Sequence, residues 1–269
     1  MASRSLTGHY QKWWLYTWYA CILWSLGYFV FYPAIPMVGD YTRGLLGYSQ
    51  RTEVAAQLAD AKAAQGQWTG KIAAQSLSAI AADPDLLQFA VAGGKAAFGD
   101  NCAPCHGSGA QGSIGYPNLN DDDWLWGGTL EDIHKTIMFG IRSNHEDTRL
   151  NDMPAFGRDQ ILNRTQIGDV TQYVLGISKQ AHDAEASKLG AVVFADNCVA
   201  CHGEGGIGNR ELGAPNLTDA LWLYGGDAAS ITRSVTLGRI GVMPAWVDRL
   251  DPVTVKELAV YVHSLGGGE

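Results

Sequence analysis

The sequence contains two related segments, each built around the motif Cys-x-x-Cys-His. The first reads GKAAFGDNCAPCHG over residues 94–107, and the second reads GAVVFADNCVACHG over residues 190–203. The same landmarks follow both motifs in the same order: Pro-Asn-Leu, a Trp, Gly-Gly, Met-Pro-Ala and Tyr-Val. An internal repeat of this kind indicates two copies of one small domain, and it constrains the fold more than any other feature of the chain.

Each copy reads as helices joined by long irregular loops. The segment before each Cys pair has a Gly and a Phe four residues apart, which places both on one face of a short helix. Residues 165–178 and 252–265 are expected to form the last helix of each copy, and Asp251 followed by Pro suits the start of the second of these helices. The intervening residues are rich in Gly, Pro, Asn and Asp, so no sheet is implied and the fold class is all-α.

The motif Cys-x-x-Cys-His is typical of covalent attachment of a c-type haem. Two thiols three residues apart on one turn can form thioethers with the two vinyl groups of a single porphyrin, and the adjacent His is held against the iron. The sequence therefore predicts two covalently bound c-type haems. The attachment residues are Cys102, Cys105, Cys198 and Cys201, and the proximal iron ligands are His106 and His202.

Two other uses of the cysteines fit the sequence less well. The four motif cysteines could form one zinc site, but the long gap between the pairs and the His after each pair argue against it. A thioredoxin-like redox pair would need a βαβ context, which the pattern lacks. The fifth cysteine, Cys21, is interpreted as a small apolar residue.

A Met thioether is the expected second axial ligand in each copy. Met153 and Met243 occupy matched Met-Pro-Ala positions, and the following Pro stiffens the loop that carries each sulfur. Met138 and His145 are rivals to Met153, and a bis-His haem would have a lower potential than a His/Met haem. The additional stretch SNHEDTRL, residues 143–150, lengthens the loop before the first of these methionines.

Four further side chains stand near these landmarks. Arg142 and Arg239 each precede a candidate Met and could pair with haem propionates, although a solvated arginine is an equally good interpretation. Trp124 and Trp222 occupy matched positions and could pack beside the porphyrin or in an ordinary core.

The N-terminal part contains a long uncharged stretch between Lys12 and Asp40. Residues 13–32 are apolar and aromatic, and about twenty helical residues span roughly 30 Å, the thickness of a bilayer core. The length, the aromatic ends and the lack of a small-residue cleavage site favour an uncleaved anchor over a signal peptide. Arg4 and Lys12 precede the segment, so the N-terminus is expected in the cytoplasm and the rest outside.

The charge balance limits the partners. Lys and Arg number 19 and Asp and Glu 27, for a formal net charge of −8. An acidic body argues against binding to nucleic acid and fits a basic protein partner. The expected organisation is an anchor at residues 1–38, a connector at 39–85, and cytochrome c domains at 86–180 and 186–269.

The whole arrangement resembles the membrane-anchored dihaem subunit of cbb3-type cytochrome c oxidases. The resemblance covers nearly the entire chain and rests on WWLYTWYACILWSLGYFVFYPAIP, on CAPCHG and CVACHG, on GIRS with its loop to MPAFG, and on the closing MPAW. It implies one transmembrane helix followed by two tandem cytochrome c domains in the periplasm, anchored in the bacterial inner membrane.

The same resemblance implies a role in respiration. Such a subunit accepts electrons from a soluble or membrane-anchored cytochrome c donor and relays them toward the haem–copper subunit that reduces oxygen, beside a monohaem cytochrome c subunit. In this interpretation one haem is bound by Cys102, Cys105, His106 and Met153, and the other by Cys198, Cys201, His202 and Met243. The chain itself then has no catalytic site, because both irons are six-coordinate.

Three alternatives stay open at this point. The first is a free-standing membrane-anchored dihaem shuttle. The second is a dihaem peroxidase-like enzyme, which would have one five-coordinate haem. The third is a gas or redox sensor in which a weakly held Met is displaced. The Cys-x-x-Cys-His motifs alone do not separate these functions.

Overall fold

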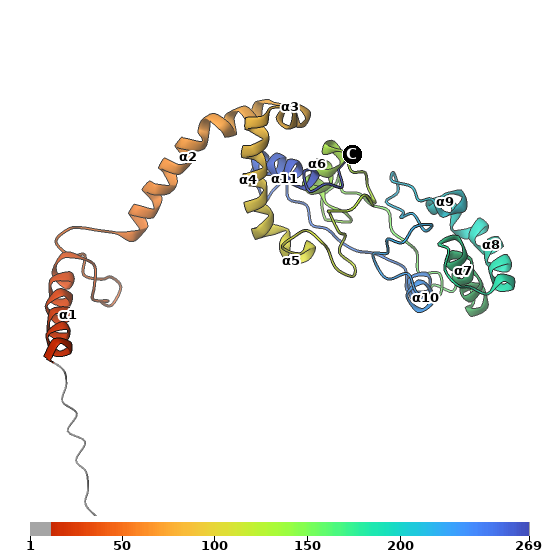
Figure 1. The fold of residues 1–269 in the computed structure, drawn as a ribbon, viewed down its shortest axis with the longest axis horizontal. Coiled ribbons are helices and arrows are strands. Elements are labelled where there is room, and N and C mark those ends of the chain that lie inside the picture. Colours follow the sequence, from red (N-terminus) through yellow and green to blue (C-terminus); the bar gives the residue numbers. More distant parts are fainter. Residues whose placement is uncertain (1–11, 269) are drawn as a thin grey trace, which may run out of the picture. The chain divides into compact units, whose positions relative to one another are not determined.

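The computed structural model describes residues 12–268, which form helices and isolated bridges but no β-strand. The all-α class is therefore confirmed. The chain divides into two units, one up to Gln67 and one from Trp68 onward (Figure 1). The helices are α1 (Lys12–Phe31), α2 (Gln50–Ala74), α3 (Leu77–Ala82), α4 (Pro84–Asn101), α5 (Ala103–His106), α6 (Leu130–Phe139), α7 (Arg164–Ile177), α8 (Ala184–Asn197), α9 (Val199–His202), the 3-10 turn η1 (Glu204–Gly206), α10 (Ala228–Leu237) and α11 (Pro252–His263).

The first unit contains α1 and the chain that follows it. None of the side chains of α1 is buried. The loop after α1 folds back on the end of this helix, because the N–H groups of Leu45 and Leu46 donate to the carbonyls of Val30 and Phe31 at 2.9 and 3.1 Å. Among the described helices, none is long and apolar enough to cross a membrane. Arg4, one of the two cations that predict a cytoplasmic N-terminus, lies outside the described residues.

The end of the expected connector belongs to the second unit. The ring of Trp68 stacks on Phe89 of α4, with ring centroids 5.9 Å apart, and Ile72 and Ile80 are fully buried. The ammonium group of Lys256 donates to the carbonyls of Ile72 and Ala73 at the C-terminal end of α2 and to that of Gln75, directly after the helix. A cation at this position also satisfies the negative end of the helix dipole.

Side-chain caps begin the main helices of the second unit. Asp83 accepts hydrogen bonds from the N–H groups at the start of α4, where Pro84 occupies the first turn. The predicted cap Asp251 does the same for α11. The remaining helices with such caps begin after Ser76, Thr129, Asn163, Asp183 and Asp227. Each cap stabilises its helix by about 1 kcal/mol.

The second unit consists of two lobes, each with its own buried core. We call the lobe formed by α3, α4, α5, α6 and α11 the first lobe, and that formed by α7, α8, α9 and α10 the second lobe. Figure 1 shows α11 beside α4 and α6, and α7 beside α8. The sequence led us to expect that each copy closes on its own last helix. The structure differs: the last helix of each copy packs in the lobe that carries the other copy's Cys pair.

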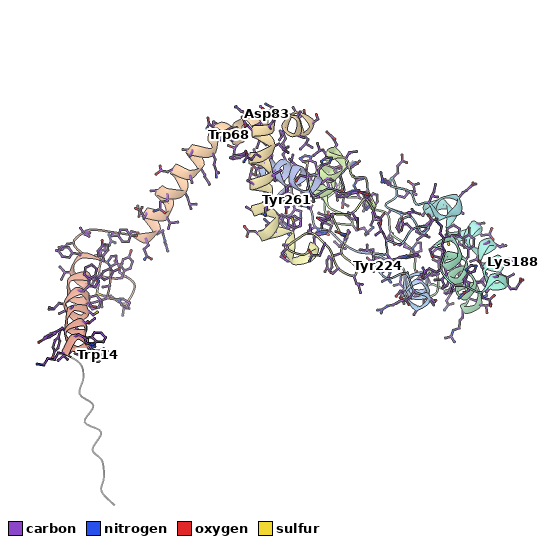
Figure 2. All side chains as sticks on the ribbon, in the orientation of Figure 1. Trp14, Trp68, Asp83, Lys188, Tyr224 and Tyr261 are labelled. Atoms are coloured by element: carbon purple, nitrogen blue, oxygen red, sulfur yellow. The ribbon has the colours of Figure 1, made fainter. Side chains whose placement is uncertain are left out.

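Two matched glycines allow these crossings. A Cβ atom at Gly94 of α4 would lie 2.2 Å from the carbonyl oxygen of Glu257 on α11, and one at Gly190 of α8 would lie 2.0 Å from that of Asp169 on α7. Next to each glycine an aromatic pair spans the same helices. Tyr261, which is labelled in Figure 2, contacts Phe98 in the first lobe, and Tyr173 contacts Phe194 in the second, with centroids 5.4 and 5.0 Å apart. The two lobes therefore contain the same helix crossing, α4 with α11 and α8 with α7. In each crossing the two helices come from different copies of the repeat.

Gly94→Ala tests this crossing. The added methyl group would overlap the backbone of α11, so we expect unfolding free energy to fall by about 1–3 kcal/mol. Gly99→Ala, on the same helix with nothing within 4 Å, is the matched control and should be neutral or stabilising by up to about 1 kcal/mol. Denaturant unfolding of the haem-loaded protein, followed by circular dichroism, measures both. Equal effects at the two positions would contradict the close packing of α4 and α11.

Candidate cofactor sites

Each Cys-x-x-Cys-His motif forms one tight helical turn directly after a long helix. The N–H of Cys102 donates to the carbonyl of Phe98 at 2.9 Å and ends α4, and the N–H of His106 donates to the carbonyl of Cys102 at 2.9 Å. The second motif has the same bonds around Cys198, at 2.8 and 2.9 Å. None of the four motif cysteines forms a disulfide, and burial raises the pKa of Cys102 and of Cys198 to about 11. Two thiols and one imidazole thus share one turn in each lobe.

The two motif histidines have matching hydrogen bonds. Nδ1 of His106 lies 3.0 Å from the carbonyl oxygen of Pro117, and Nδ1 of His202 lies 3.1 Å from that of Pro215. Because a carbonyl only accepts, Nδ1 must carry the proton, and the lone pair of Nε2 is available to a metal. Burial lowers the pKa of both histidines, against the smaller opposite effect of these hydrogen bonds, which keeps the imidazoles neutral.

The two proline carbonyls were not identified from the sequence as functional groups. A signal for them was present, because Pro-Asn-Leu recurs after both motifs at residues 117–119 and 215–217. Tight turns bring these segments back to the histidines. The N–H of Gly112 donates to the carbonyl of His106, and the N–H of Gly208 donates to that of His202, each at 2.7 Å.

A cavity of about 450 Å³ opens in the second lobe and reaches the segment after the first Cys pair, where Tyr116, Asp121 and Leu125 are among its lining residues. It is lined by the thiols of Cys198 and Cys201, by His202 and by Met153. The other second-lobe side chains around it are mostly apolar and include Val170, Val174, Phe194, Leu217, Trp222, Ile231 and Val235. Two thiols, a neutral imidazole, a thioether and an apolar wall are the donor set and surroundings that a c-type haem requires, so the residues fit this group.

The first lobe brings together the corresponding residues around its own core. Cys102, Trp124, Met138 and Met243 all pack against the same buried cluster. Met153 packs instead against the core of the second lobe, with Cys198. The expected grouping of Met153 with His106 and of Met243 with His202 thus differs from the structure.

The alternative ligand His145 is held within its own loop. Its Nδ1 accepts a hydrogen bond from the N–H of Asp147 at 3.1 Å, and its ring lies 4.8 Å from that of Phe139. The loop, residues 143–150, folds back on α6 through Arg149, whose guanidinium lies 3.2 Å from the carboxylate of Asp132. The additional stretch of the first copy therefore packs beside α6.

The two arginines considered for propionate binding both line the cavity. Arg142 donates from Nε to the carbonyl of Gly241 at 2.5 Å and from Nη1 to that of Asn151. Arg239 donates to the hydroxyl of Ser234 from Nε and Nη2, at 3.0 and 2.7 Å, and its guanidinium lies 3.9 Å from the ring centre of Tyr224. Both cations are placed beside the cavity by contacts with the protein, and several donors of each remain for an anionic group.

The structure gives no support to a shared zinc site. The two Cys pairs lie in different lobes, and within residues 12–268 no three His, Cys, Asp or Glu side chains gather as a metal-binding cluster. The matched tryptophans also separate: Trp124 packs in the first lobe, where its indole N–H donates to the carbonyl of Gly267, and Trp222 packs in the second.

Comparison with known proteins identifies one family, in agreement with the resemblance noted in the sequence. The family described as cytochrome c oxidase, cbb3-type, subunit III matches residues 89–174 and 185–262. The chain is 54% identical to the Cbb3-type cytochrome c oxidase subunit CcoP of Azospirillum brasilense, over 99% of this chain and 92% of that protein. It is 53% identical to the subunit CcoP of Cereibacter sphaeroides, over 96% and 89%. It is 52% identical to the subunit FixP of Bradyrhizobium diazoefficiens, also over 96% and 89%.

Proposed function

Because this chain belongs to the subunit III family of cbb3-type cytochrome c oxidases, we propose that its two lobes carry electrons through two covalently attached c-type haems. The chain is an electron-transfer subunit of the oxidase complex, and its cytochrome c domains imply c-type haem. The single observation that carries the finer proposal is the repeated turn of two thiols and one imidazole with a free Nε2.

The proposed roles of the residues follow from their chemistry. Cys102 and Cys105 attach one haem and Cys198 and Cys201 the other. The iron ligands are His106, His202, Met153 and Met243. A haem held in this way supplies reversible one-electron transfer at its iron.

These ligands favour electron transfer over catalysis. An imidazole and a thioether would together occupy both axial positions of an iron, which leaves no open position for a substrate. The proline carbonyls orient the imidazoles, and the apolar walls exclude water, so the chain's own task is to set the reduction potential. The peroxidase-like and sensor alternatives would need a methionine to be absent or displaced.

We also propose that α1 anchors the chain in the inner membrane, with the N-terminus in the cytoplasm and the haem lobes in the periplasm. In support, α1 has 20 residues with Lys12 as its one charged side chain, and none of its side chains is buried. Its many Trp and Tyr residues lower its average hydropathy, but such rings are favoured at the membrane–water interface. Its exposed aromatic and aliphatic side chains would be covered by lipid and by neighbouring subunits.

The proposed partners are the haem–copper catalytic subunit, the monohaem cytochrome c subunit and a cytochrome c donor. The net charge of −8 would attract a basic donor and raise its association rate, an effect that salt weakens. The alternative is a free-standing dihaem shuttle, which would have the same haem sites without a stable oxidase complex.

Purification from the native membrane in mild detergent separates these two proposals. We expect the chain to co-purify with a subunit that contains b-type haem and copper, in a complex that consumes oxygen. Subunit identification by mass spectrometry and haem-type analysis provide the measurement. A chain recovered alone with two c-type haems and no b-type haem would overturn the oxidase proposal in favour of the shuttle.

A further inference from the structure

We propose that Arg142 is a positioning residue for both haem sites, because its one guanidinium holds the two loops that carry Met153 and Met243. The inference rests on the proposed function, since it takes these two methionines as iron ligands. It adds that the two sites are not independent. A single side chain sets the position of both loops, so a change at Arg142 alters both haems together.

The guanidinium of Arg142 contacts the two loops at equivalent points. Nε donates to the carbonyl of Gly241 at 2.5 Å, and Nη1 donates to the carbonyl of Asn151. Gly241 lies two residues before Met243, and Asn151 lies two residues before Met153. Because the guanidinium is planar and rigid, it fixes the same backbone atom of each Met loop relative to the other.

No ion pair accounts for the position of this side chain. Arg142 is half-buried, and no carboxylate of residues 12–268 forms an ion pair with it. A guanidinium that loses part of its hydration needs hydrogen-bond acceptors in return, and here the acceptors are the two loop carbonyls. The contacts that stabilise the cation are therefore the same contacts that join the loops.

The backbone of Arg142 is held on both sides. Its φ is +51°, in the left-handed region that residues with a side chain rarely adopt. The N–H of Arg142 donates to the carbonyl of Arg149 at 2.7 Å. The preceding residue, Ile141, exchanges two backbone hydrogen bonds with Met243, both at 3.0 Å. These contacts maintain an unfavourable conformation, as is typical of residues with a functional role.

The matched position of the second copy lacks this side chain. Gly140 and Gly238 end α6 and α10 with nearly the same φ, +70° and +71°, so the residues that follow them can be compared directly. On this basis Arg142 corresponds to Ile240, which is exposed. The side chain of Arg239 donates to a hydroxyl group on α10 of its own copy. The repeat thus departs from symmetry at Arg142, which contacts both Met loops.

The test replaces Arg142 by glutamine in the full-length, haem-loaded chain. Arg142→Gln removes the rigid pair of donors, so both methionine–iron bonds should weaken. We expect the midpoint potentials of both haems to fall, because thioether ligation raises the potential of a haem. The methionine–iron charge-transfer absorption of the oxidised protein should also lose intensity in both steps of an optical redox titration.

Arg158→Gln is the matched control. Arg158 lies five residues after Met153, and its exposed side chain donates to the carboxylate of Asp159 at 2.9 Å. This variant should leave both potentials and the absorption band unchanged.

Arg142→Lys separates position from charge. Lysine keeps the cation but lacks the planar pair of donors, so both potentials should fall in this variant as well. Wild-type potentials and absorption in Arg142→Lys would overturn the positioning role, because the charge alone would then be sufficient.

The outcomes also separate this proposal from the proposed function. A fall in the potential of one haem only, or of neither, in Arg142→Gln would overturn the joint positioning and leave His/Met ligation intact. Absence of the charge-transfer band from the unsubstituted chain would overturn His/Met ligation, and the proposal with it. Where Arg142→Gln does not fold with two haems, Arg142→Lys provides the comparison, and two unchanged potentials there would overturn the proposal.

Discussion

Replacing Cys198 and Cys201 together by alanine is expected to remove one of the two haems and leave the other attached. No other thiols lie on the turn formed by α9, so the second lobe would lose both covalent links at once. The first lobe has its own pair, Cys102 and Cys105, on α5. Haem content per chain, measured by the pyridine haemochrome spectrum and by the mass of the intact protein, should fall from two equivalents to one.

Cys21→Ala is the matched control for this experiment. Cys21 is a free and exposed cysteine on α1, in the other unit of the chain, and its replacement should leave two haems. Two equivalents in the variant without Cys198 and Cys201 would contradict attachment at the second motif. The reciprocal replacement of Cys102 and Cys105 should also leave one haem, and it should spare the second lobe with its cavity of about 450 Å³.

Much of each site follows from local sequence. The Cys-x-x-Cys-His turn, the helix before it and the capped last helix are all encoded by short patterns, and the structure contains them at the expected places. The matched Met-Pro-Ala positions identified two methionines that lie in the two lobes. The proline carbonyls that orient His106 and His202 could have been inferred from the repeated Pro-Asn-Leu.

The grouping of helices into lobes did not follow from the same patterns. Because the copies are alike, the helices α7 and α11 both present a Tyr-Val pair, and either could pack on α4 or on α8. What distinguishes them is the connection. α7 ends at Ile177 and α8 begins at Ala184, and helices joined by so short a loop usually pack side by side as an antiparallel pair. α7 therefore packs on α8 in the second lobe, and α11 packs on α4 in the first lobe.

The turn between α7 and α8 is stabilised by its own contacts. Lys179 adopts a positive φ of 61°, and the side-chain amide of Gln180 donates to Ser178 and to the carbonyl of Gly226, at 3.0 and 2.9 Å. Since Gly226 lies just before α10, this turn is bonded to the second lobe. Periodicity and capping describe single helices. They do not indicate whether α7 packs on α4 or on the similar helix α8.

A chain cut between Ala181 and His182 is expected to stay associated. Both residues are exposed, so a specific protease site can be inserted between them. The cut divides each lobe between the two fragments: the N-terminal fragment keeps α4, α6 and α7, and the C-terminal fragment keeps α8, α10 and α11. If each copy closed on its own last helix, the same cut would fall between two complete domains.

The apolar side chains that each fragment buries in the other's lobe should hold the two fragments together strongly. The C-terminal fragment contributes α11 to the first lobe, where Leu258 and Ala259 are fully buried and Val255, Val260 and Val262 nearly so. The N-terminal fragment contributes Val170 and Val174 of α7 to the second lobe. Each buried Val or Leu side chain stabilises by about 1.5–3 kcal/mol, so the two contacts together should hold the fragments at micromolar concentration.

Size-exclusion chromatography of the cut, haem-loaded protein provides the measurement. The fragments should elute together at the position of the uncut chain in native buffer, and separate only in denaturant. The uncut chain with the same inserted site is the control for any effect of the insertion. Separation of the fragments in native buffer would contradict the exchange of α7 and α11, because only an exchanged pair of lobes divides both cores between the two fragments.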